Sequence, residues 1–96
     1  MIVSFGDRAT EDFFHGIRSS RVRRFPPNIT KATLLKLDIL NAAYSLDDLL
    51  IPPGNRLEAL GGQLQGFYSI RINSQWRIIF RWQQQQAHEV RIVDYH

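Results

Sequence analysis

The amino-acid sequence predicts an α+β fold in which two N-terminal helices pack on one face of a small, mostly antiparallel sheet, in the order β-α-α-β-β-β-β. The sheet is predicted by three runs rich in aromatic and β-branched residues, at 67–72, 76–82 and 89–93, which short polar turns separate. The helices are predicted by apolar residues that recur at helical spacing in the N-terminal half. With 96 residues and a hydrophobic content of 44%, the chain can bury one core, so we predict a single domain over residues 1–96.

The first predicted elements are a short strand and a helix. Residues 2–5 alternate briefly between apolar and polar side chains and end at a glycine, which is typical of a short strand. Asp7 comes next, and aspartate is a favourable residue at the start of a helix. The first helix is therefore predicted over residues 8–15, where apolar side chains recur at helical spacing up to Gly16.

The second helix is predicted to open at the proline pair 26–27 and to run to about Ala43. Proline suits the first turn of a helix, and Asn28 or Thr30 can cap it. A broad apolar stripe on this helix is expected to be the main cover of the sheet. The stripe comprises Leu34, Leu35, Leu37, Ile39, Leu40, Ala43 and Tyr44.

Between this helix and the three strand-like runs, the chain is expected to form one extra turn, one strand and one loop. Residues 45–48 match a capping box and predict a single turn that ends at 52–54. Residues 55–60 are too short for a helix and are predicted to be a strand, followed by a mobile loop at 61–66. In this strand Leu57 and Ala59 are expected to face inward and Glu58 outward.

Strand alternation divides the run at 76–82 into two faces, one expected to be buried and the other to carry cations. By the same rule Arg71, in the preceding run, projects from the same surface as Arg77. This surface is therefore the first place to look for an anionic ligand. The expected buried set is Trp76, Ile78, Phe80 and Trp82, and the opposite set is Arg77, Ile79 and Arg81.

The composition favours an anionic partner and argues against a metal site. The net charge is +3 and the isoelectric point is about 9.8. Four arginines crowd the segment 18–24, here called the basic link, which either holds phosphates or is simply solvated. There is no cysteine and the three histidines are widely spaced, so we predict no disulfide, no metal and no cofactor. The four arginines are Arg18, Arg21, Arg23 and Arg24.

The N-terminus has no basic segment followed by an apolar core. No run approaches the roughly 18 apolar residues of a membrane span. We therefore expect a soluble, cytoplasmic protein without a membrane partner.

Four short motifs carry a resemblance to a known family. They read Arg-Leu-Glu-Ala-Leu at 56–60, Ser-Ile-Arg-Ile-Asn at 69–73, Trp-Arg-Ile at 76–78 and Asp-Tyr-His at 94–96. Together they resemble the HigB toxins of bacterial type II toxin–antitoxin modules, a branch of the RelE/ParE superfamily. The similarity covers nearly the whole chain in length and element order, and its specific part is the C-terminal third.

This resemblance implies a RelE-like fold and a ribosome-dependent mRNA endonuclease, an mRNA interferase, that enters the decoding site and inhibits translation. It implies cleavage without a metal, by attack of the ribose 2′-hydroxyl on the adjacent phosphate. It also implies a small helix-turn-helix antitoxin, HigA, as the neutralising partner, with DNA contacted only indirectly through that antitoxin.

The resemblance further implies site residues. Arg77 matches the motif arginine of the family, and Asp94, Tyr95 and His96 match its terminal catalytic triplet. Glu58 stands where better-known members place a histidine, and it can still accept a proton.

Gly61 stands where those members place a lysine. The expected RNA-binding residues are Arg56, Arg71, Arg23 and Arg24. Two other functions stay open on this sequence: a ParE-like inhibitor of DNA gyrase that cuts no RNA, and an RNA-binding module without catalysis.

Overall fold

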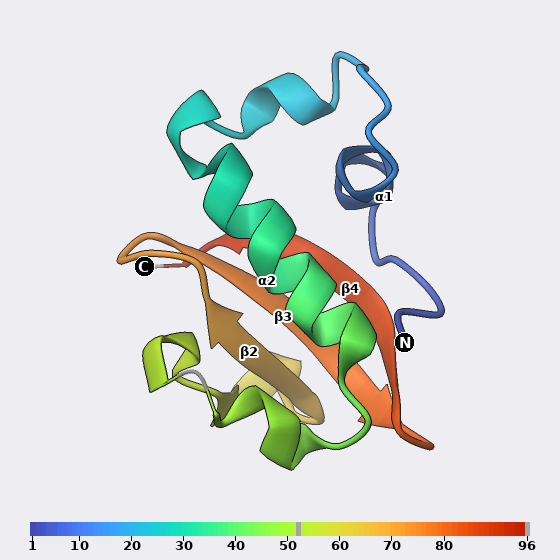
Figure 1. Cartoon of the computed structure of the whole chain (residues 1–96), viewed down its shortest axis with the longest axis vertical. Coiled ribbons are helices and arrows are strands. Elements are labelled where there is room, and N and C mark those ends of the chain that lie inside the picture. Colours follow the sequence, from blue (N-terminus) through green and yellow to red (C-terminus); the bar gives the residue numbers. More distant parts are fainter. Residues whose placement is uncertain (52, 96) are drawn as a thin grey trace.

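Two helices lie on one face of a four-stranded antiparallel sheet, as Figure 1 shows for the computed structural model, which describes residues 1–51 and 53–95. The helix α2 lies across the sheet and α1 lies beside the edge strand β4. The predicted α+β architecture is therefore confirmed. The helices are α1 (Arg8–Phe14) and α2 (Thr30–Ala42), and the strands, in sheet order, are β1 (Glu58–Ala59), β2 (Phe67–Arg71), β3 (Trp76–Gln83) and β4 (Gln86–Asp94).

Five short 3₁₀ helices connect these elements. The predicted turn after α2 is confirmed as η3, where the Asp48 carboxylate accepts hydrogen bonds from the backbone N–H groups of Tyr44 and Ser45. Pro52, in the predicted stop at 52–54, lies outside the described residues. The five are η1 (Val22–Arg24), η2 (Pro27–Ile29), η3 (Leu46–Leu49), η4 (Pro53–Asn55) and η5 (Gly62–Leu64), the last within the predicted loop 61–66.

The predicted strand at residues 2–5 was wrong. This segment makes only two isolated parallel bridges to β4, Ile2 to Ala87 and Phe5 to Val90. Between them Glu89 has a left-handed φ of 54° and lies in the β-bulge of β4, so the edge does not present a continuous ladder. The N-terminal residues still follow the edge closely, because the backbone N–H groups of Ala87 and Val90 donate to Met1 O and Ser4 O, at 2.9 and 3.1 Å.

The helix α1 begins as predicted. Asp7 is its N-cap, and Asp7 Oδ1 accepts a hydrogen bond from Thr10 N at 2.8 Å. The Thr10 side chain is fully buried, and its Oγ1 accepts from Ile92 N at 2.9 Å. This bond ties the first turn of α1 to the outer edge of β4.

We expect Thr10→Val to lower the free energy of unfolding by about 1–3 kcal/mol, because the change keeps the side-chain shape and leaves a buried N–H group without its acceptor. Urea unfolding followed by circular dichroism would measure this. Thr30→Val is the matched control, since Thr30 is exposed. Equal unfolding free energies for both variants would show that the bond between α1 and β4 contributes nothing.

The cap and the breadth of α2 differ from expectation. Neither Asn28 nor Thr30 caps it, because η2 leads straight into the helix and Ile29 at the N-cap already has helical backbone angles. Leu37 and Leu40 are fully buried, as predicted, and Ala43 is 6% exposed. The predicted apolar stripe was too broad, however, because some of its members are exposed, while the polar residue Thr33 is fully buried on this helix. The exposed members are Leu34, Leu35 and Tyr44.

The faces of β3 follow the predicted alternation. Ile78 and Phe80 are fully buried against the helices, and Trp76 and Trp82 pack beside them. The turn to β4 is shorter than expected, because Gln84 and Gln85 alone form it, both with positive φ. β4 consequently begins before the predicted run at 89–93.

The predicted strand at 55–60 is much shorter in the structure. Arg56 has a positive φ of 46°, so regular pairing begins only at Glu58. Leu57 packs against the core as predicted, whereas Ala59 is exposed and its inward prediction was wrong. Asn55, just before, is fully buried and donates to Leu49 O at 3.1 Å.

Asn55 also accepts a hydrogen bond from Lys36 Nζ, and burial lowers the pKa of that lysine. These bonds fix the residues just before β1 against α2 and η3.

The helices within the described ranges are all too short or too polar to span a bilayer.

Candidate active site

Arg77 is the centre of a polar cluster on the sheet face opposite the helices. Its side chain is only 11% exposed. Its Nη1 donates to Ser69 Oγ at 2.7 Å and to the Arg56 backbone oxygen at 3.4 Å. Its Nη2 donates to Glu58 Oε1 at 2.9 Å. The guanidinium is thus fixed in one orientation by three neighbours.

The register of the sheet explains this cluster. Glu58 pairs with Ser69 across β1 and β2, and Arg71 pairs with Arg77 across β2 and β3. Since partners across a ladder share a face, all four side chains belong to one surface. The expectation that Arg71 and Arg77 share a surface is confirmed, and Glu58 joins them from a strand that does not neighbour β3.

Tyr95 completes the cluster from the end of β4. Its ring lies over the Arg77 guanidinium, with 5.0 Å between the ring centroid and Cζ. Its backbone N–H donates to Gln75 O at 2.6 Å, so the chain is anchored up to this residue. Tyr95 as a whole residue is 39% exposed, which leaves part of it available to a ligand.

Asp94 lies on the other face of the sheet. It pairs with Trp76, whereas Val93 pairs with Arg77, so Asp94 and Tyr95 project in opposite directions. Gln75 Nε2 donates to Asp94 Oδ2 at 3.1 Å, and the backbone oxygen of the same glutamine accepts from Tyr95. Asp94 therefore connects to the cluster through Gln75. His96 lies outside the described residues.

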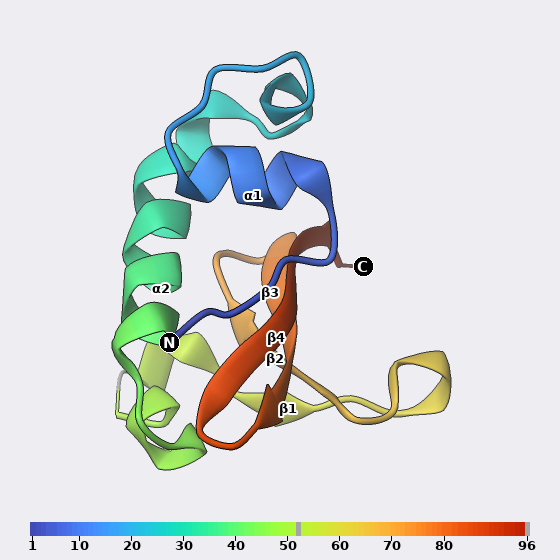
Figure 2. The same cartoon turned by 90° about the vertical axis from the view of Figure 1, so that its right-hand side faces the viewer.

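Arg56 and the basic link stand in different places relative to this cluster. Arg56 contributes its backbone oxygen to Arg77, and its own side chain is exposed. The basic link, with Arg23 and Arg24, lies at the end of the molecule beyond α1 and α2, far from β1 in Figures 1 and 2. The structure therefore does not bring Arg23 and Arg24 to the Arg77 cluster.

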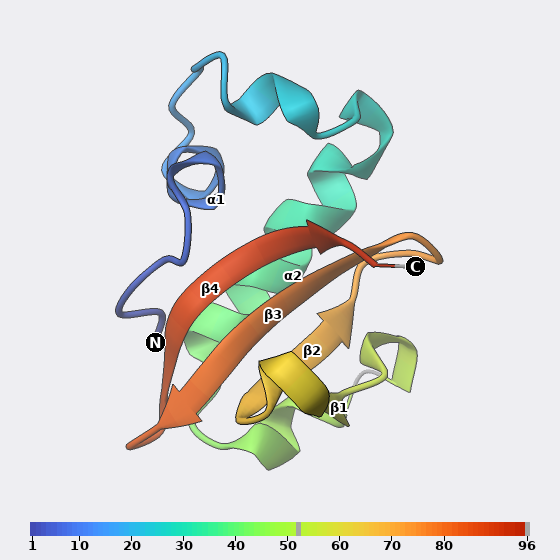
Figure 3. The ribbon, with the colours of Figure 1, turned by 180° about the vertical axis from the view of Figure 1, so that it is seen from behind.

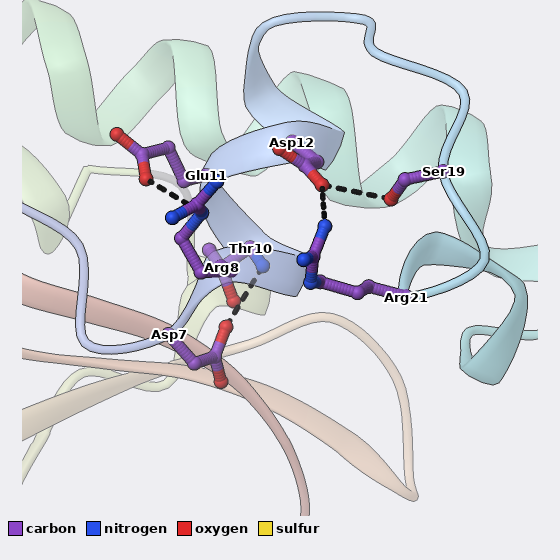
Figure 4. A network of polar contacts seen from close by, with 7 residues as sticks. All are labelled: Asp7, Arg8, Thr10, Glu11, Asp12, Ser19 and Arg21. Carbon is purple, nitrogen blue, oxygen red and sulfur yellow. Dashed lines mark hydrogen bonds and ion pairs between the residues drawn. The ribbon is translucent and has the colours of Figure 1, made fainter.

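Part of the charge on the basic link is used to hold it in place. Arg24 pairs with Asp7 at 2.9 Å, and Arg21 pairs with Asp12 at 3.4 Å. Ser19 Oγ also donates to Asp12 at 2.7 Å, as Figure 4 shows together with the cap of α1. Arg18 and Arg23 have no ion-pair partner among the described residues.

Ser69 was not singled out from the sequence. It is fully buried, and its hydroxyl makes the shortest contact to Arg77. Residues two apart on a strand share a face, so the position of Ser69 two residues before Arg71 was the signal that could have found it. In the described part of the chain no three His, Cys, Asp or Glu side chains are grouped to hold a metal ion.

The model of a known family matches residues 3–96, and its description is a RelE-like toxin of the type II toxin–antitoxin system HigB. Toxin HigB-1 of Vibrio cholerae is 46% identical over 82 residues, which are 85% of this chain and 84% of that protein. An uncharacterised protein of Haemophilus influenzae is 34% identical over 67 residues, 70% of this chain and 66% of its own.

Solved structures agree in fold. The YoeB–YefM complex from Staphylococcus aureus matches with a TM-score of 0.60 at 18% identity, covering 100% of this chain and 98% of that one. YafQ from Escherichia coli matches with a TM-score of 0.55 at 16% identity, covering 98% and 93%. The family match spans nearly all of the sequence, and the motifs at 69–73, 76–78 and 94–96 lie inside it. The chain therefore belongs to the HigB-like toxins, the RelE-like toxins of type II toxin–antitoxin systems.

Proposed function

We propose that this toxin is a ribosome-dependent endoribonuclease that cuts mRNA at the decoding site of the small subunit and so inhibits translation. The observation that carries the proposal is the buried and fixed guanidinium of Arg77, which already binds a carboxylate on a face that no long helix covers. A planar fork that accepts a carboxylate also suits a phosphate, because both offer two oxygens at similar spacing.

In the proposed reaction the scissile phosphate replaces Glu58 at Arg77 Nη2. The freed Glu58 carboxylate takes the proton from the ribose 2′-hydroxyl, and the 2′-oxygen forms a bond to phosphorus. Arg77 stabilises the charge that grows on the phosphorane oxygens. The bond from phosphorus to the 5′-oxygen breaks, and His96 gives a proton to that oxygen. The products are a 2′,3′-cyclic phosphate and a 5′-hydroxyl, and no metal ion takes part in these steps.

The remaining candidates have supporting roles. Tyr95 stacks on a base with the exposed part of its ring. Asp94 positions Tyr95 by holding Gln75, whose backbone oxygen binds the Tyr95 N–H group. Arg56 and Arg71 bind the RNA backbone beside Arg77, and Arg23 and Arg24 contact RNA from the basic link.

The proposed neutralising partner is a HigA-like helix-turn-helix antitoxin, with DNA bound only through it. One of the solved structures of similar fold is a YoeB–YefM complex, which supports an antitoxin as partner. We propose a cytoplasmic location, where ribosomes and mRNA are found.

Primer-extension mapping of a translated mRNA tests the proposed reaction. We expect discrete cuts inside codons with ribosomes and none without them. Intact message together with accumulating DNA breaks would contradict the proposal and favour a gyrase inhibitor. Intact message with no DNA breaks, but with stable binding to ribosomes, would instead favour an RNA-binding module without catalysis.

Arg18 and Arg23 test the role of the basic link. Neither forms an ion pair with a carboxylate among the described residues, so their replacement should not disturb the fold. We expect the double variant Arg18→Gln/Arg23→Gln to bind ribosomes more weakly. The slope of log K against log salt concentration should become smaller by about 0.7–0.9 for each lost phosphate contact. Cleavage of bound message should continue at the parental rate. The control Arg8→Gln/Lys31→Gln removes the same charge from exposed positions on α1 and α2. An equal effect of both double variants would mean that net charge alone matters.

A further inference from the structure

A second group of arginines lies on the same sheet face as Arg77, toward the other end of the strands. Arg81 pairs with Phe67 across β2 and β3, and Arg91 pairs with Ile79 across β3 and β4. Ladder partners share a face, so all of these side chains belong to the face that carries Arg77. Figure 3 views this face directly: α2 lies behind the sheet, α1 lies beyond its β4 edge, and the segment around η5 rises in front of it.

Phe67 is only 7% exposed although neither α1 nor α2 covers its face of the sheet. The guanidinium carbon of Arg81 lies 4.3 Å from its ring centroid and that of Arg91 lies 5.9 Å from it. Both distances are within the range of cation–π contacts. Both arginines therefore contact the Phe67 ring, and we call Arg81 and Arg91 the Phe67 arginine pair.

The backbone leaves room for both arginines. A Cβ atom at Gly66, which has a φ of 93°, would lie 2.8 Å from Arg81 Nη1. A Cβ atom at Gly6 would lie 2.4 Å from Arg91 Cγ. Both distances are shorter than real Cβ contacts allow, so any larger residue would displace the arginine. Two glycines from distant parts of the chain therefore leave space for these two arginine side chains.

The charge at this place is incompletely balanced. Arg81 Nε pairs with Glu89 Oε2 at 3.0 Å, and both side chains are partly exposed. Within the described ranges no carboxylate forms an ion pair with Arg91. Two guanidinium groups beside one ring are therefore accompanied by one paired carboxylate, and the excess positive charge favours an anion at this place.

We propose that the Phe67 arginine pair is a second phosphate-binding site, which holds a backbone phosphate of single-stranded RNA a few nucleotides from the phosphate at Arg77. The choice of RNA rests on the proposed function. Arg77 and Arg81 are four residues apart on β3, which corresponds to about 13 Å along the strand. A single row of cations on one sheet face follows one backbone, whereas double-stranded RNA is contacted across its minor groove and along two strands.

The test measures binding of the full chain to a single-stranded oligoribonucleotide of about ten nucleotides, by fluorescence anisotropy at several salt concentrations. The oligonucleotide carries 2′-O-methyl groups, so that it cannot be cleaved. We expect Arg81→Gln/Arg91→Gln to weaken binding and to reduce the slope of log K against log salt concentration by about 0.7, because each neutralised phosphate on a single strand contributes about 0.7 and the site holds one phosphate. Arg81→Lys/Arg91→Lys should restore most of the slope, since lysine keeps the charge.

Arg8→Gln/Lys31→Gln is again the matched control, and thermal unfolding checks that each variant is folded. The site is excluded if the Gln double variant keeps the parental slope, if the control lowers the slope equally, or if the unmodified chain does not bind the oligonucleotide. Equal affinity of the unmodified chain for an RNA hairpin stem would exclude single-stranded RNA as its specific ligand. A chain that binds RNA through Arg81 and Arg91 but does not cut mRNA on ribosomes would contradict the proposed function and leave this site standing.

Discussion

Arg77→Ala should slow mRNA cleavage on ribosomes by about 10²–10³-fold, because removing one donor that stabilises transition-state charge typically has this effect. The guanidinium of Arg77 is held by Ser69 and by the Arg56 backbone, so it is aimed before substrate arrives. Single-turnover cleavage of mRNA bound to ribosomes is the measurement. Arg77→Lys should recover only part of the rate, since an ammonium group keeps the charge and loses the planar fork.

A loss of fold must be separated from this loss of rate. Arg77 is largely buried, and its removal leaves the Ser69 hydroxyl without a partner. Thermal unfolding and binding to the proposed antitoxin should therefore be measured on the same preparations. A folded Arg77→Ala protein that cuts at the parental rate would exclude Arg77 from the reaction.

Glu58→Gln should change affinity and rate in opposite directions. The carboxylate occupies Arg77 Nη2 in the free protein, so its neutralisation removes a competitor of the phosphate and should lower the Kd for RNA. The rate of the bound complex should fall by about 10²–10⁴-fold, the usual contribution of a general base. Anisotropy with a non-cleavable RNA and single-turnover cleavage would measure the two effects separately.

Glu11→Gln is the control for this change, because Glu11 forms only a weak pair with Arg8 at 3.9 Å on the exposed side of α1. It alters the net charge equally and should leave both quantities unchanged. If Glu58→Gln lowers the Kd and keeps the parental rate, Glu58 only blocks the site. If both quantities stay at the parental value, Glu58 has neither role.

The sequence predicted the parts of this molecule that depend on strand alternation. The faces of β3 and the shared surface of Arg71 and Arg77 follow from a period of two, which holds wherever a strand is regular. The contact between Glu58 and Arg77 was not predictable in the same way. It depends on the register in which the two-residue strand β1 pairs with β2, and this register leaves no periodic signal in the sequence.

The C-terminal triplet shows a second limit. Adjacent residues on a strand project to opposite faces, so Asp94 and Tyr95 cannot both face Arg77. Strand alternation would have predicted this separation if the last strand had been expected to reach Asp94. The predicted strand ended at residue 93, one residue too early. On α2, the exposure of Leu34 and Leu35 follows from how the helix is rotated on the sheet, which depends on packing and not on local sequence.

The N-terminal segment has a consequence for how copies of this protein behave toward one another. An exposed edge strand offers unpaired N–H and C=O groups to any other strand, which is a common route to aggregation. Here the segment 1–6 binds the edge of β4 at Ala87 and Val90, and Thr10 binds it at Ile92. At the opposite edge β1 has only two residues. Proteolytic loss of the first six residues would therefore uncover much of the β4 edge, and copies of the toxin would then be able to pair strand to strand through it.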